Sequence, residues 1–333
     1  MRDGSRAAAG ITRRSLLAAT LALPATASAR TQPPPTPPLL SLVVGSPPGR
    51  GADPSARAFA PFLERHLRNV RVAVLNRPGE AGLAALRLLA SSDASGLTLG
   101  WVSSPTLPAR MVDRDAPGLL DRLRLVGAVQ KEPLVFVSSP RSPLASVGDL
   151  LRRAGEDSAA MALGTPPEGS PGHLAALRLQ ALTGTKLQIV AFPSATAARQ
   201  AAQGGHAAAA VLAMGDAIEA LREGTLSGLG VATRRPHRAM PDVAPLHASG
   251  VALQATILRG LALPAAADPA RIAALQAALA RIATDPEFIA AGDESGFQPI
   301  TLPGPTWTAE VEKDHTILTT LWSLSPWTPT PAG

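Results

Sequence analysis

The chain contains no cysteine among its 333 residues, and this absence removes three possibilities at once. A disulfide framework, a thiol nucleophile and a thiolate metal site all need cysteine. Aromatic residues make up only 3% of the sequence, and the basic residues are scattered arginines with lysine only at Lys131, Lys186 and Lys313. Because nucleic-acid surfaces need a basic stripe, with aromatic side chains where single strands bind, we expect no nucleic-acid partner.

The signatures of common catalytic sites are also lacking. The six histidines show no metal-ligand spacing, there is no P-loop, and Ser170 is not in a G-x-S-x-G elbow because position 168 is Glu. One enzymatic alternative stays open, an exported Rossmann oxidoreductase. Residues 49–51 (Gly-Arg-Gly) follow a predicted strand and Arg77 ends the next, but the third glycine of the fingerprint is Pro54. We therefore expect a non-enzyme with no catalytic residue, cofactor or metal.

Charge and composition describe an ordinary globular protein. The formal net charge is +6, of which residues 1–14 supply +3, leaving a mild +3 on the rest. Apolar residues make up 46%, and the length is enough for two domains with well-filled cores.

The first 29 residues are predicted to form an export signal. Arg13 and Arg14 form a twin-arginine motif, an apolar run over 16–23 follows, and small residues end at Ala29. The apolar run is too short to span a bilayer. We expect cleavage near Ala29 and a proline-rich tether over 30–38, because proline-rich chain is extended and cannot join a sheet or helix. An uncleaved tail is the alternative.

The stretch over 40–54 predicts a strand, a glycine-rich loop and a helix start. Asp53 is expected to cap the helix, with Pro54 at the first helical position. Apolar residues at helical spacing follow from Ala56 to Leu67. Free N–H groups and the helix dipole favour anions at such a start, so this loop is half of a proposed carboxylate site.

A second unit of the same kind begins at residue 161. A short strand leads through a loop to Ser170 and Pro171, which repeat the arrangement of a cap followed by proline. Further strands are predicted over 70–75, 97–102, 187–192 and 207–212, with helices over 83–90, 195–203, 269–284 and 307–322. Alternating strands and helices predict an α/β fold whose ligands lie at the carboxyl ends of parallel strands.

Seven short motifs in order then resemble one family, the periplasmic substrate-binding proteins of tripartite tricarboxylate transporters, also called the Bug family. The resemblance covers about residues 40 to 325. The motifs are Gly49-x-Gly51-x-Asp53 with Arg57, Asn76-Arg77-Pro78-Gly79, Gly96-x-Thr98-Leu99, Gly169-Ser170-x-x-His173, Gly224-x-Leu226, Pro241-Asp242-Val243-Ala244-Pro245 with Gly250, and Asp285-Pro286-Glu287.

The resemblance implies a two-lobed type II periplasmic-binding fold, in which each lobe is a mostly parallel sheet flanked by helices. Lobe 1 would comprise 39–133 and 258–333, and lobe 2 would comprise 134–257. The chain would be a periplasmic monomer that traps a small carboxylate between its lobes and delivers it to membrane transporter subunits. The ligand-binding residues would be Ser46, Gly49, Arg50, Gly51, Ala52, Asp53, Ser104, Thr106, Gly169, Ser170, His173, Phe192 and Asp216.

Several positions depart from the family pattern where the ligand would lie. Gly45-Ser46 replaces a Pro-Phe pair, Arg50 replaces a glycine, and Phe192-Pro193-Ser194 replaces Tyr-x-Gly. An Arg50 that faced the ligand would favour diacids through a bidentate pair, whereas an Arg50 in solvent would contribute little. Loss of ligand binding, leaving a sensor or partner protein on the same fold, is a further alternative.

Overall fold

The computed structural model describes residues 37–327, so the predicted signal and most of the predicted tether lie outside the described residues. Strands and helices alternate along this part of the chain, which confirms the predicted α/β class. The strands are β1 (Leu39–Val44), β2 (Arg71–Asn76), β3 (Thr98–Ser104), β4 (Leu123–Ser138), β5 (Ala162–Thr165), β6 (Gln188–Ala191), β7 (Ala209–Ala213), β8 (Ser227–Val231), β9 (Thr256–Pro264) and β10 (Gln298–Pro303). The helices are α1 (Asp53–Leu67), α2 (Leu83–Ala90), α3 (Thr106–Asp113), α4 (Val147–Glu156), α5 (Pro171–Thr183), α6 (Ala195–Gln203), α7 (Met214–Arg222), α8 (Pro269–Ala283), α9 (Pro286–Ser295) and α10 (Gly304–Leu324).

The strands form one mixed sheet in the order β2-β1-β3-β9-β4-β7-β5-β6, with β8 and β10 also paired to β4. Pairing is parallel within β2-β1-β3 and within β7-β5-β6, as predicted, and antiparallel wherever β4 or β9 takes part. We name β2, β1, β3, β9, β10 and the first part of β4 the first half-sheet. The second half-sheet comprises β6, β5, β7, β8 and the end of β4.

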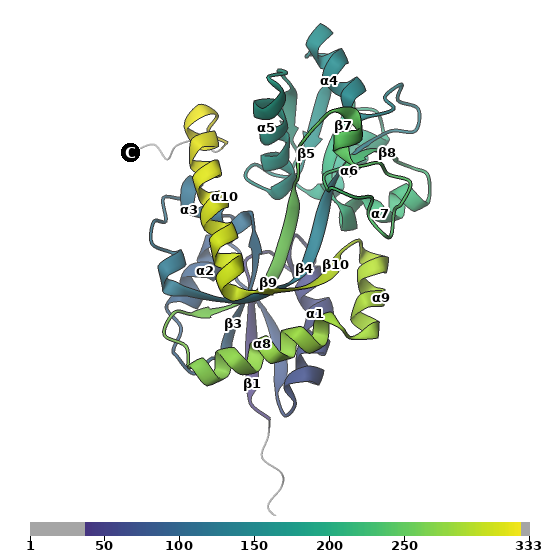
Figure 1. Ribbon diagram of the computed structural model, residues 1–333. Helices are drawn as coiled ribbons and strands as arrows, with labels where there is room; N and C mark the ends of the chain where they lie inside the picture. Colours follow the sequence, from purple (N-terminus) through teal and green to yellow (C-terminus); the bar gives the residue numbers. More distant parts are fainter. Residues whose placement is uncertain (1–36, 328–333) are drawn as a thin grey trace, which may run out of the picture. The chain divides into compact units, whose positions relative to one another are not determined.

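Strand β4 joins the two half-sheets. The sequence shows two short apolar runs here, over 123–126 and 134–137, and the structure joins them in one strand of 16 residues. From Leu123 to Pro133 it pairs with β9 and β10, and from Leu134 to Ser138 it pairs with β7 and β8. Figure 1 shows β4 and β9 running together from one half-sheet toward the other.

Helices cover both faces of each half-sheet (Figure 1). Helices α1, α8 and α9 bury one face of the first, and α2, α3 and α10 bury the other. Helices α4 and α5 cover one face of the second, and α6 and α7 the other. Helices α1, α3, α5 and α7 each come after a strand in the chain, so all four begin at carboxyl ends of strands. Among residues 37–327, no helix combines the length and the apolar character that crossing a membrane requires.

Candidate functional site

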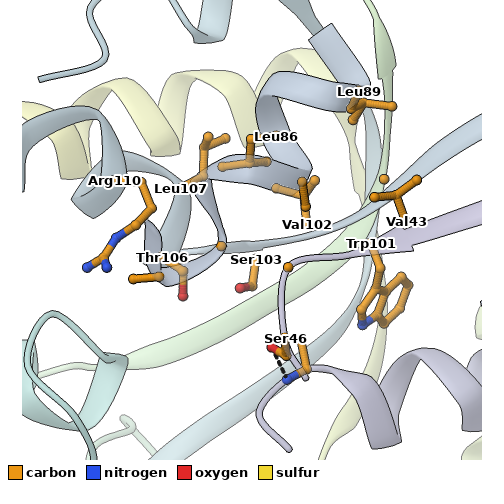
Figure 2. A pocket seen from close by; sticks show the side chains of 16 residues that line it. Val43, Ser46, Leu86, Leu89, Trp101, Val102, Ser103, Thr106, Leu107 and Arg110 are labelled. Carbon is orange, nitrogen blue, oxygen red and sulfur yellow. Dashed lines mark hydrogen bonds between the residues drawn. The ribbon is translucent and has the colours of Figure 1, made fainter. Parts of the chain in front are cut away.

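A cavity of about 70 Å³ lies at the carboxyl ends of β1 and β3, under helices α2 and α3. Figure 2 shows the hydroxyl groups of Ser46, Ser103 and Thr106 on one side of it and apolar side chains such as Leu86 and Leu89 on the other. All sixteen lining residues belong to the first half-sheet and its helices. They are Val43, Gly45, Ser46, Ala52, Ala81, Gly82, Ala85, Leu86, Leu89, Gly100, Trp101, Val102, Ser103, Thr106, Leu107 and Arg110.

The loop between β1 and α1 is folded tightly around Ser46. The Ser46 Oγ accepts a hydrogen bond from the Ala52 N–H at 3.1 Å, which leaves the hydroxyl proton free to donate. Gly51 has φ +56°, and a side-chain carbon there would lie 2.7 Å from the same Oγ. Glycine is therefore required at position 51, and the close approach fixes Ser46 at the wall of the cavity.

Asp53 differs from its prediction as a helix cap. Ala52 is the N-cap residue, and Asp53 is the first residue of α1, 1% exposed. Its carboxylate accepts from the Gly49 N–H at 2.7 Å, from Asn76 Nδ2 at 2.7 Å and from Arg57 Nε at 3.0 Å. Burial raises the pKa of Asp53, but these hydrogen bonds outweigh it and hold the pKa below its ordinary value. The carboxylate thus braces the loop internally.

Helix α3 brings two further polar side chains to the cavity. Thr106 begins the helix and Arg110 follows one turn later on the same face. Ser103, at the end of β3, lines the cavity between them and Ser46. Among residues 37–327, the hydroxyls of Ser103 and Thr106 have no hydrogen-bond partner, so both are free to bind a ligand oxygen. Ser104, by contrast, is buried and accepts from Trp307 Nε1 at 3.0 Å.

Arg110 connects the cavity to the second half-sheet. It is 2% exposed, forms an ion pair with Asp113, and donates from Nη2 to the Gly169 carbonyl at 3.1 Å. Asp113 in turn accepts from Trp327 Nε1 at 2.7 Å. Burial raises the pKa of Asp113, and Arg110 and Trp327 oppose that rise. These contacts hold α3, the start of α5 and the end of the described chain together.

The Gly169–His173 turn forms the other side of that contact. Ser170 caps α5 as predicted, its Oγ accepting from the His173 N–H at 3.3 Å. His173 Nδ1 accepts from the Gly169 N–H at 3.3 Å, and burial lowers the pKa of His173 to about 4, so the ring is neutral at pH 7. A side-chain carbon at Gly169 would lie 2.9 Å from Asp113 Oδ2. This turn is packed against protein and lines no part of the cavity.

The other predicted residues are spread over the loops. Gly49, Arg50 and Gly51 are exposed, and Phe192 is half-buried beside Gly164. Asp216 lies in the first turn of α7. Of the thirteen predicted residues, the cavity brings together Ser46, Ala52 and Thr106.

Asp216 belongs to a separate charged cluster near the crossing strands. Burial raises its pKa to about 6, and the nearby Glu132 carboxylate adds to the rise. Glu132 pairs with Arg259 and accepts from the Gly215 N–H at 2.8 Å, while Arg199 donates to the Asp216 carbonyl at 2.9 Å. Within residues 37–327, no group of three or more acidic or histidine side chains is arranged to hold a metal ion.

Sequence reasoning missed Ser103, Arg110 and the apolar walls. A signal was present for Arg110, because it follows Thr106 by four residues on one helix face at the end of a strand. The walls at Leu86 and Leu89 come from α2, whose approach depends on Gly45. A side-chain carbon at Gly45 would lie 2.8 Å from Gly82 Cα, and nothing in the local sequence reports that close contact.

Comparisons with known proteins agree with this fold. A family model described as tripartite tricarboxylate transporter family receptor matches residues 56–305. The curated protein BugT of Bordetella pertussis is 29% identical over 214 residues, which are 62% of this chain and 65% of BugT. The match thus spans slightly less than two thirds of that relative.

Two solved structures from Rhodopseudomonas palustris are similar throughout. The protein Rpa4515, determined with adipate, has a TM-score of 0.76 at 19% identity, over 86% of this chain and 96% of that one. MatC, determined with bound malate, has a TM-score of 0.71 at 20% identity, over 85% of this chain and 98% of that one. At these identities the likeness establishes the shared fold.

Proposed function

Because the chain belongs to the tripartite tricarboxylate transporter family of receptors, we propose that it is a periplasmic receptor that captures a small carboxylate and delivers it to a membrane transporter of that type. The family is one of transport receptors, not of enzymes, which argues against the oxidoreductase alternative. The observation that carries the proposal is the cavity at the carboxyl ends of β1 and β3, where three hydroxyl groups face apolar walls.

The cavity chemistry suits reversible binding. Hydroxyl donors from Ser46, Ser103 and Thr106 can hold carboxylate oxygens, and the start of α3 adds the favourable end of a helix dipole. The structures with malate and adipate belong to proteins of the same fold, and they support a carboxylate as the ligand class here.

We further propose that binding is coupled to a hinge motion of two lobes, 39–133 with 258–333 and 134–257. The change of β4 pairing partners between Pro133 and Leu134 supports this division. The second-lobe residues Phe192 and Asp216 would then meet the ligand only through closure, which selects the ligand-bound state. Gly169, Ser170 and His173 are already covered by Arg110 and Asp113, so any contact of theirs with the ligand would need that cover to open.

We also propose that the protein is exported by the twin-arginine route, is cleaved near Ala29 and is a monomer. Replacing Arg13 and Arg14 with Lys should leave the precursor in the cytoplasm. Normal export and processing of that variant would favour the general secretory route instead.

Calorimetry on the chain from residue 30 onward tests the function. Titration with mono- and dicarboxylates, including malate and adipate, should give saturable binding to at least one, and small-angle scattering should show compaction at saturation. If native mass spectrometry and a broad thermal-shift screen also detect no ligand, the sensor or partner alternative replaces the receptor. An unchanged radius of gyration at saturation would reject the hinge motion alone.

A further inference from the structure

A second cavity, of about 340 Å³, lies between helices α5 and α10 and shares no lining residue with the cavity described above. Figure 1 shows these two helices next to each other, α5 on the second half-sheet and α10 on the first. Both proposed lobes line the cavity, through Leu174 and Arg178 from one and Asp314 and Leu318 from the other. Small-molecule pockets span roughly 300–1,000 Å³, so a small ligand held here would contact both lobes.

Much of the cavity wall is apolar. The buried side chains of Leu134, Leu174, Leu258 and Leu318 line it. Ile317 lines it too and is 36% exposed, so part of this apolar surface is open to water. The hydrocarbon part of a ligand would remove that surface from water and be stabilised by burial.

Four charged side chains also line the cavity, two of each sign. They are Arg178 from α5 and Glu310, Lys313 and Asp314 from α10. Asp314 follows Glu310 by four residues, and the lining residue Leu318 follows Asp314 by four, so one face of α10 is turned toward the cavity. The total charge around this space is zero, although both signs are present.

Arg178 and Asp314 are the half-buried members of this set. Within residues 37–327, neither the Asp314 carboxylate nor the Arg178 guanidinium forms a hydrogen bond or an ion pair. Burial raises the pKa of Asp314, and the positive charge of Arg178 opposes that rise. The two opposite charges therefore act on each other from either side of the cavity without direct contact.

A zwitterion matches these charges better than an ion of one sign. A ligand carboxylate can accept charge-assisted hydrogen bonds from Arg178, and a ligand ammonium group can donate them to Asp314. An anion alone would leave Asp314 half-buried without a partner, and a cation alone would leave Arg178 in the same state.

From these observations we propose that the cavity between α5 and α10 is a second ligand site, which binds an α-amino acid with an apolar side chain. Arg178 binds the carboxylate, Asp314 binds the ammonium group, and the side chain packs on Leu174 and Leu318. This site is separate from the proposed carboxylate site, and its occupation does not depend on the receptor function.

Nuclear magnetic resonance titration of the chain from residue 30 onward tests the proposal by location. Backbone amide resonances over 172–178 and 310–318 report on this cavity, and those over 43–53 and 100–107 report on the first. Leucine should shift the first set of resonances in a saturable manner. Leucine that shifts neither set, or only the resonances of the first cavity, would overturn the proposal.

Two analogues of leucine test the need for both charges. 4-Methylpentanoate keeps the carboxylate and the hydrocarbon tail, and 3-methylbutylamine keeps the ammonium group and the tail. At pH 7, leucine should bind at least tenfold more tightly than either analogue, as read from the resonances over 172–178 and 310–318, because each analogue loses one set of charge-assisted hydrogen bonds. An analogue that binds there as tightly as leucine would exclude a zwitterion site.

Variants then assign the two charges. Asp314→Asn and Arg178→Gln break no hydrogen bond among residues 37–327, so both should fold, and each should weaken leucine binding at least tenfold. The matched control is Glu312→Gln, which removes an exposed charge on α10 that does not line this cavity and should keep the affinity within about threefold. Unchanged affinity in Asp314→Asn or Arg178→Gln, or an equal loss in the control, would contradict the assignment. Carboxylate binding in the first cavity is a separate measurement, so failure here leaves the receptor function intact.

Discussion

Two helix starts in this protein share a local sequence and differ in what surrounds them. Asp53-Pro54 and Ser170-Pro171 each follow a strand and a glycine-containing loop, and both predict an anion site. The loop before α1 borders the cavity through Ser46 and Ala52. The turn before α5 is covered by Arg110, Asp113 and Trp327. The difference teaches that a free helix N-terminus becomes a binding site only where the tertiary structure leaves space in front of it.

The largest expected effect is a difference in unfolding free energy between the variants Gly169→Ala and Gly49→Ala. Both glycines have positive φ, +68° and +72°, so each variant carries backbone strain of about 1–2 kcal/mol. A side-chain carbon at Gly49 meets nothing within 4 Å, whereas one at Gly169 meets the buried Arg110–Asp113 pair. Disrupting that pair should raise the total loss of unfolding free energy for Gly169→Ala to about 4 kcal/mol or more, measured by urea denaturation.

Gly184→Ala is the matched control for this pair. Gly184 has the same φ of +68° as Gly169, and nothing lies within 4 Å of an added side-chain carbon. It should therefore resemble Gly49→Ala. If all three variants lose the same stability, the turn before α5 is not tightly covered and the contrast between the two helix starts fails.

His173 should give the second turn its own pH dependence. The folded pKa is about 4 because of burial, against an ordinary value of 6.5, so between these values only the unfolded chain binds the proton. Stability contributed by neutral His173 is present above pH 6.5 and is lost as the pH falls to about 4, by up to about 3 kcal/mol. Unfolding free energies measured from pH 7 to 4 should show this slope, and His173→Gln should flatten it. An equal slope in the variant would assign the proton uptake to other groups.

Trp327→Phe should lower the free energy of unfolding by about 1–3 kcal/mol, because Asp113 loses the 2.7 Å hydrogen bond while it stays buried. Trp322 is the control, since it stacks edge-on against Trp327 with ring centroids 4.7 Å apart and is only half-buried. Trp322→Phe should reduce stability less than Trp327→Phe when both are followed by thermal denaturation. A larger loss for Trp322→Phe would mean that ring packing, and not the hydrogen bond, holds Asp113 in place.

Asp53→Asn should have the smallest effect, about 1–2 kcal/mol at pH 7, through loss of charge-assisted hydrogen bonds from Gly49 and Arg57. The folded pKa of Asp53 lies below its ordinary value of 3.8. Its contribution is therefore present above that value and is lost as the pH falls through the folded pKa. The difference between variant and wild type, followed by denaturation at several pH values, should shrink below about pH 4. A difference that stays constant down to pH 2 would contradict the bracing role of the charge.

Much of the fold could be predicted from periodicity and caps. The helices over 83–90 and 195–203 match α2 and α6 at both ends, and Ser170 caps α5 as predicted. The family resemblance is confirmed by the matching family model. Helix α9 and strand β10 were not predicted, because their apolar residues pack on partners distant in the sequence, such as Phe59 against Phe288.

The site was predicted less completely, for a physical reason. The first loop could be found because glycine, an acidic residue and proline at a helix start are local signals. Whether Ser103 or Ser104 lines the cavity depends on the face of β3 that Trp307 occupies, 203 residues further along. The cover over Gly169 likewise comes from Arg110 and Trp327, which no local pattern connects.

The most direct test of the account is a crystal structure of the protein with a bound small carboxylate. The account predicts the carboxylate at Ser46, Ser103 and Thr106, in the cavity that Leu86 and Leu89 also line. A carboxylate held instead by the N–H groups of Ser170 to His173, with Arg110 and Trp327 displaced, would contradict it.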